Sequence, residues 1–62
     1  MEKYALEMID TINLNIAMAY EYFQIHHKND ELGLAKIRGM IDMLRILTDK
    51  NYIITASGLK EV

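Results

Sequence analysis

The chain is 62 residues long, carries a formal charge of −2 at pH 7, and contains neither cysteine nor proline. This length allows a single domain, 1–62, and a domain of this size buries only about 60% of its unfolded surface, which leaves a monomer marginally stable. Without cysteine, neither a disulfide nor a thiolate metal site can add stability. We therefore expect a homo-oligomer, with a dimer favoured.

Charge is divided unevenly along the chain. Residues 1–31 hold six acids against two bases, whereas residues 32–62 hold three acids against five bases. Two segments of opposite sign that pack together explain this pattern, and a weakly basic surface for a polyanion is the alternative. The start, MEKYALEMID, is acidic where a signal peptide is basic, and no apolar run approaches the roughly 18 residues of a membrane span. We therefore expect a soluble, cytoplasmic protein.

The first predicted element is a long helix over about residues 2–27. No glycine occurs before Gly33, and without proline nothing compels a break. Apolar residues recur at spacings of three and four, which places them in one stripe that must be buried. This stripe contains Ala5, Ile9, Ile12, Ile16, Ala19 and Phe23.

A second apolar patch lies on the same helix, away from that stripe. The polar side of the helix is charged at Glu7 and at Glu21 but turns apolar between them. One partner helix cannot cover both surfaces, so the patch indicates an oligomer or partner interface. The predicted interface residues are Leu14, Ala17, Met18, Tyr22 and Ile25. A charge at the centre of the patch, as in Leu14→Asp, is expected to convert an oligomer to monomers.

The segment FQIHHKNDELGL contains the densest group of metal-ligating and acid/base side chains. A metal site would draw on His26, His27, Asp30 and Glu21, but adjacent helical residues point about 100° apart, and neither H-E-x-x-H nor E-x-x-H occurs. A helix corner explains the same residues, since Asn29 or Asp30 can cap a second helix and histidines suit the end of the first. We predict a corner, with no metal site and no cofactor.

The second predicted helix spans about residues 31–49. Its apolar stripe contains Leu34, Ile37, Ile41, Leu44 and Thr48, and a charged stripe contains Arg38, Asp42, Arg45 and Asp49. The charged stripe is interpreted as a solvated face. Gly39 interrupts this helix, either as a tolerated glycine or because another helix or a tyrosine approaches closely. Asn51 is expected to end the helix in the left-handed conformation.

The C-terminal segment, residues 52–62, changes character. Tyr52, Ile53 and Ile54 favour an extended conformation that Gly58 ends. Such a segment can pack over the helices as an arm, pair with the same strand of another chain, or receive a partner strand. We predict a tail-mediated contact through Tyr52, Ile53 and Ile54, and helices that do not depend on the tail.

No arrangement typical of catalysis is found. Glu7 and Asp10 share a helix face but are expected to be exposed, and general acid/base chemistry needs a buried cleft. Ser57 is the only serine and lacks the G-x-S-x-G context of a nucleophile. The three glycines are isolated, so no phosphate-binding loop is present. The sequence therefore predicts a protein that is not an enzyme.

The expected fold is all-α: an antiparallel two-helix hairpin with an extended tail, two copies of which form a four-helix bundle. The expected function is a small non-enzymatic protein–protein interaction or regulatory module that acts as a homo-oligomer and inhibits or adapts a protein partner. A nucleic-acid-binding transcriptional regulator is one alternative, although Asp42 and Asp49 interrupt the basic residues Lys36, Arg38 and Arg45. A purely structural oligomer subunit is the other.

Overall fold

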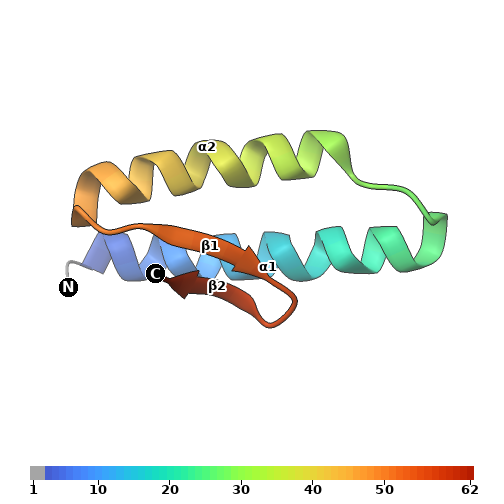
Figure 1. Ribbon diagram of the computed structural model, residues 1–62, viewed down its shortest axis with the longest axis horizontal. Helices are drawn as coiled ribbons and strands as arrows, with labels where there is room; N and C mark the ends of the chain where they lie inside the picture. The colour runs from blue at the N-terminus through green and yellow to red at the C-terminus, as the bar shows by residue number, and fades with distance from the viewer. Residues whose placement is uncertain (1–2) are drawn as a thin grey trace.

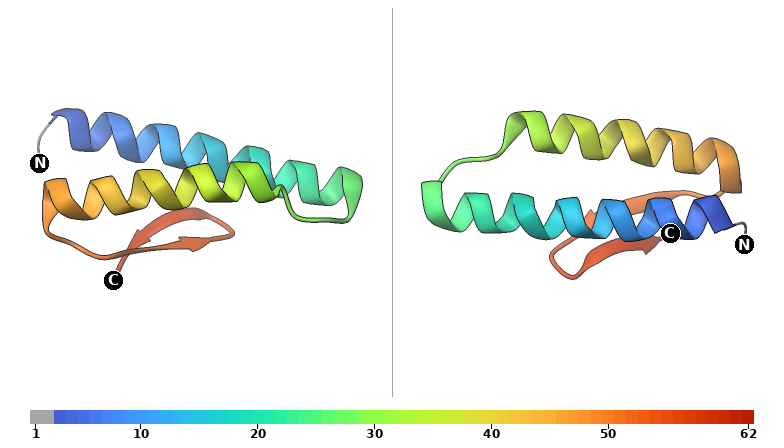
Figure 2. Two further views of the ribbon diagram at one scale, coloured as in Figure 1. Left: turned by 90° about the horizontal axis from the view of Figure 1, so that it is seen from above. Right: turned by 180° about the vertical axis from the view of Figure 1, so that it is seen from behind.

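The computed structural model describes residues 3–62 and contains two helices followed by a β-hairpin (Figure 1). The helices run antiparallel along the 36 Å length of the molecule, and the hairpin lies across one side of the pair (Figures 1 and 2). The opposite side of the helix pair carries no other described element (Figure 2). The elements are α1 (Lys3–His26), α2 (Glu31–Thr48), β1 (Tyr52–Thr55) and β2 (Gly58–Glu61).

The antiparallel helix pair confirms the predicted helical hairpin, but the all-α class is only partly right, because the mostly helical chain ends in a β-hairpin. Within the tail, β1 and β2 pair antiparallel, from Tyr52 opposite Glu61 to Thr55 opposite Gly58. Gly58, expected to end an extended segment, instead begins β2 and has a φ of 121°, a conformation that favours glycine. The Thr55 hydroxyl closes the turn by donating to the Gly58 carbonyl at 2.7 Å. The tail therefore finds its partner strand within its own chain.

The corner between the helices is built largely as predicted. His26 is the last residue of α1, and His27 follows with a φ of 56° while its N–H donates to the Phe23 carbonyl at 2.7 Å. Asp30 caps α2, since its Oδ1 accepts from the Gly33 N–H at 3.1 Å. The predicted start of the first helix at Glu2 lies outside the described residues.

The end of α2 corrects one expectation. Asp49, with a φ of 55°, occupies the left-handed position and its N–H donates to the Arg45 carbonyl at 2.8 Å. Aspartate tolerates this conformation nearly as well as asparagine. Asn51, expected in this role, belongs to the hairpin, because its carbonyl accepts from the Val62 N–H at 2.9 Å.

Both predicted core stripes are buried over most of their length, with one exception. Phe23, at the corner end of its stripe, remains 48% exposed. The tail supplies one core residue, since Tyr52 is 4% exposed, and Ile54 and Leu59 pack against the same cluster. The buried hydrophobic residues are Ala5, Ile12, Ile16, Ile37, Ile41, Leu44 and Tyr52. The tail therefore takes part in the core, although the helix stripes were expected to be complete at Thr48.

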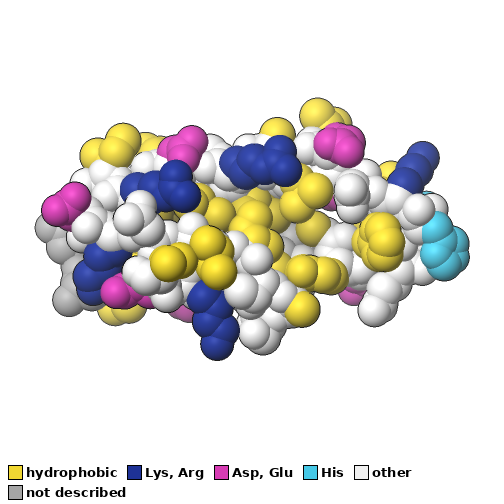
Figure 3. Space-filling view, in the orientation of Figure 1, with side chains coloured by type: hydrophobic (Ala, Val, Ile, Leu, Met, Phe, Trp, Pro, Cys, Tyr) yellow, Lys and Arg dark blue, Asp and Glu magenta, His cyan; other side chains and the backbone are white. Residues whose placement is uncertain are grey.

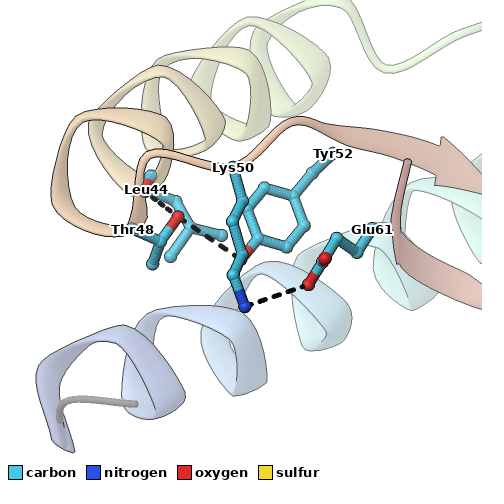
Figure 4. Close-up of polar contacts among 5 residues, drawn as sticks. All are labelled: Leu44, Thr48, Lys50, Tyr52 and Glu61. Carbon is cyan, nitrogen blue, oxygen red and sulfur yellow. Dashed lines mark hydrogen bonds and ion pairs between the residues drawn. The ribbon is translucent and has the colours of Figure 1, made fainter.

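Tyr52 is held at the end of α2 (Figure 4). Its hydroxyl donates to Thr48 Oγ1 at 3.4 Å, and Thr48 in turn donates to the Leu44 carbonyl at 2.8 Å. Lys50 and Glu61 form an ion pair at 3.5 Å that spans the start and end of the hairpin. Both charged side chains are about half exposed, so the pair contributes little stability, and the buried ring of Tyr52 is the main anchor of the hairpin.

Gly39 has open space beside it, because a Cβ built there meets no atom of the described chain within 4 Å. Glycine is about 1 kcal/mol less favourable than alanine inside a helix. Gly39→Ala should therefore raise the free energy of unfolding by about 0.5–1 kcal/mol in urea titrations followed by circular dichroism. Gly33→Ala provides the contrast, since its Cβ would collide with the capping carboxylate of Asp30 and should lower stability. A destabilised Gly39→Ala protein would contradict the open surroundings of Gly39.

Candidate functional site

The histidine corner does not assemble into a metal centre. His26 and His27 are both exposed, and the His26 ring packs on Tyr22 with centroids 4.3 Å apart. Within residues 3–62, no three histidine, aspartate or glutamate side chains come together in a way that could hold an ion. Asp30 is engaged in capping α2. The structure thus gives this segment a role in turning the chain.

The side of the helix pair opposite the hairpin carries exposed apolar side chains from both helices. Asn13 marks the hairpin side of α1, because its Oδ1 accepts from the Leu59 N–H of β2 at 2.8 Å. Tyr4 and Tyr22 are each nine residues from Asn13, which is two and a half helical turns. They therefore point to the side that the hairpin leaves uncovered.

The same geometry places α2 on this surface. Leu34 lines the same groove as Ile54 of β1 and so faces the hairpin side. Met43 is nine residues from Leu34 and faces away from the hairpin, with Leu32 and Leu47 on the same side at spacings of eleven and four. We call the combined surface the hairpin-free face. It comprises Tyr4, Met18, Tyr22 and Ile25 of α1 with Leu32, Met43 and Leu47 of α2.

Six of these seven side chains are exposed. Their exposed fractions range from 47% for Leu47 to 86% for Leu32, and only Tyr22 is half-buried. Isolated surface hydrophobes are common on any protein, whereas a contiguous patch across two helices is typical of an interaction surface. The described chain thus exposes apolar side chains on this side of both helices.

Most of the predicted interface residues fall on or beside this face. Met18, Tyr22 and Ile25 belong to it, and Leu14, which is 63% exposed, lies at its edge. Ala17 does not belong with them, because it lies about 140° around α1 from Tyr22, towards the hairpin side. The contribution of α2 was missed by sequence reasoning, although the spacing of Leu32, Met43 and Leu47 could have indicated it.

Polar groups on this face are few. Thr11 donates from its hydroxyl to the Glu7 carbonyl at 3.0 Å, and the Asn15 side chain donates to the Thr11 carbonyl at 2.8 Å. The Thr11 hydroxyl and the Asn15 amide therefore each have a hydrogen-bond acceptor within α1, and these bonds need no group from a partner. Lys36 is the cation on the α2 side, since it lies seven residues, or about two turns, from Met43.

The two helices differ in charge. Residues 3–26 contain three acids and one base, a net charge of −2, and residues 31–48 contain three bases and two acids, a net charge of +1. On the outside of α2, Arg45 pairs with Asp42 at 3.4 Å, as expected for a solvated stripe. Asp42 therefore interrupts the basic surface of α2 that a polyanion would need.

The predicted tail contacts are divided by the hairpin. Tyr52 is buried in the core and Ile54 is half-buried, so neither offers a free surface as a whole. Ile53 is 52% exposed on the outer side of the hairpin. Only Ile53 among these three therefore remains open to a partner.

Neither helix in the described part of the chain is long and apolar enough to cross a membrane. Comparisons of this chain with protein-family models, with curated proteins and with solved structures give no match.

Proposed function

We propose that this chain is a small, non-enzymatic protein–protein interaction module that works as a homodimer. The proposal rests on the exposed apolar side chains that α1 and α2 both carry on the hairpin-free face. Two copies packed through this face form a layer of four helices between two outer hairpins. We assign no catalytic role, since Glu7 and Asp10, the paired carboxylates of α1, are both exposed to solvent.

The dimensions of the molecule support a second copy as the occupant of this face. Seen down its shortest axis, the whole molecule has an outline of 36 by 19 Å, or about 680 Å², and a stable interface buries about 800 Å² of accessible surface on each partner. Accessible area exceeds a flat outline because side chains project from it. A second copy also supplies apolar burial to a chain in which seven hydrophobic residues of 3–62 are buried.

Charge favours one arrangement of the two copies. When α1 of one copy lies over α2 of the other, a helix of charge −2 faces a helix of charge +1. A two-fold axis along the length of the molecule produces this contact twice. An arrangement with α1 over α1 would place like charges together. We therefore favour a symmetric dimer in which each α1 contacts the partner's α2.

Met18→Asp tests this proposal, because it places an unpaired carboxylate within the hairpin-free face. We expect the dimer dissociation constant to rise at least about 100-fold, since desolvating such a charge costs several kcal/mol. Each monomer should keep its fold, because Met18 is 58% exposed. Sedimentation equilibrium at micromolar concentration measures the effect, and Leu14→Asp should act in the same direction.

Gln24→Asp is the matched control, because Gln24 is an exposed polar residue on another side of α1. It should sediment like the wild type. A wild-type chain that is monomeric, or a Met18→Asp chain that remains dimeric, would contradict the proposal.

A further inference from the structure

An open apolar groove lies on the hairpin side of the molecule, beyond the turn of the hairpin. It forms because the hairpin is shorter than the helix pair and leaves the corner half of the two helices uncovered (Figure 1). The groove has a volume of about 240 Å³. Figure 3 shows hydrophobic side chains gathered between the helices on this side.

The lining is apolar apart from Tyr20 and the residues at one end. Ile16 and Phe23 of α1, Leu34 and Ile37 of α2, and Ile54 of β1 supply apolar walls. Phe23 is 48% exposed although it continues the core stripe of α1. The groove therefore leaves part of that stripe without a covering residue from the described chain.

The polar end is formed by Asn29 and Asp30. Asp30 is half-buried, and its Oδ1 accepts from the Gly33 N–H at 3.1 Å. A carboxylate has acceptor capacity on both oxygens, so one backbone donor leaves room for a cation. An apolar groove that ends at a carboxylate is complementary to an apolar group with a neighbouring positive charge.

We propose that this groove binds a segment of a partner protein that presents a bulky apolar side chain next to a lysine or arginine, with the cation against Asp30. The volume is below the roughly 300 Å³ at which small-molecule sites begin and suits one or two large side chains. This inference goes beyond the proposed homodimer, because the groove and the hairpin-free face lie on opposite sides of the helix pair. A dimer can present two such grooves outward.

The capped dipeptide acetyl-Phe-Lys-amide is the probe, titrated into ¹⁵N-labelled protein and followed by amide chemical shifts. Saturable shifts should centre on residues 16–23, 29–37 and 54. Acetyl-Ala-Lys-amide should give no saturable shift, and acetyl-Phe-Glu-amide should bind about threefold or more weakly because its charge faces Asp30. Equal binding of the two Phe peptides would overturn the assigned role of Asp30.

Two variants make the test specific. Asp30→Asn retains a side chain that caps helices well and removes the charge, so Phe-Lys binding should weaken about threefold with little change in stability. Ala19→Leu fills the groove, which Ala19 lines, and should weaken binding at least about tenfold. Ala17→Leu adds the same side chain at an exposed position of α1 and should leave binding unchanged.

Sedimentation of the same variants separates this inference from the proposed homodimer. Asp30→Asn and Ala19→Leu should leave the dimer intact. Loss of the dimer in Ala19→Leu would show that a second copy occupies the groove. Absence of saturable Phe-Lys binding in the wild type would overturn the inference about the groove and would leave the proposed homodimer unaffected.

Discussion

Deletion of residues 52–62 should abolish cooperative folding. Truncation of a buried aromatic side chain to alanine costs about 3–5 kcal/mol, and the whole stability of a chain of this length is about 3–9 kcal/mol. The deletion removes buried Tyr52 together with Ile54 and Leu59, which pack on the core. The exposed helices should then retain only part of their helical signal.

Thermal unfolding followed by circular dichroism at 222 nm measures this loss. Tyr52→Ala should reproduce most of the effect of the deletion. Tyr52→Phe, which removes only the 3.4 Å hydrogen bond to Thr48, should cost less than about 1 kcal/mol. If the helices of the truncated protein kept the helical signal and the thermal transition that they have in the full chain, the hairpin would not be part of the core.

Gly58→Ala should destabilise the protein by about 2–4 kcal/mol. Gly58 is buried and has a φ of 121°, where a Cβ is strained. A Cβ there would also lie 2.9 Å from Asn13 Oδ1. That oxygen accepts from the Leu59 N–H at 2.8 Å, so the added methyl group pushes on the hydrogen bond that joins β2 to α1.

Urea denaturation of Gly58→Ala and of Asn13→Ala separates the effect of a Cβ at position 58 from the effect of losing the hydrogen bond between Asn13 and Leu59. Asn13→Ala should cost about 1–3 kcal/mol, because it leaves the partly buried Leu59 N–H without its acceptor. Ser57→Ala, in the exposed turn beside Gly58, serves as the control and should change stability by less than about 0.5 kcal/mol. A Gly58→Ala protein as stable as this control would contradict the close packing of the turn on α1.

The helices could be predicted from the sequence because their signals are local. Spacings of three and four identified the buried stripes, and an aspartate just before a renewed apolar pattern identified the cap at Asp30. The hairpin was missed because its turn, Ala56–Ser57, lacks the Asn-Gly or Asp-Gly signal of a tight turn. Its contact with α1 joins Asn13 to Leu59, residues 46 positions apart, and no local pattern encodes such a pairing.

The candidate surfaces likewise divide into parts with a local signal in the sequence and parts that depend on how the elements pack. Met18, Tyr22 and Ile25 could be predicted as an exposed patch, since they lie on one helix. The spacing of Leu32, Met43 and Leu47 places them on one face of α2, but only the packing of α2 and the position of the hairpin show that this face lies beside the α1 patch. The groove could not be predicted at all, because its walls come from α1, α2 and β1 together.

The homodimer is tested most directly by isotope-filtered NOE spectroscopy on a sample in which half of the copies carry ¹³C-labelled methionine methyl groups. Met18 and Met43 lie on the α1 and α2 parts of the hairpin-free face and are both more than half exposed. The proposed arrangement predicts NOEs from the Met43 methyl group to α1 of the unlabelled copy and from the Met18 methyl group to its α2. Absence of cross-chain NOEs from both methyl groups, in a wild-type protein that sediments as a monomer, would contradict it.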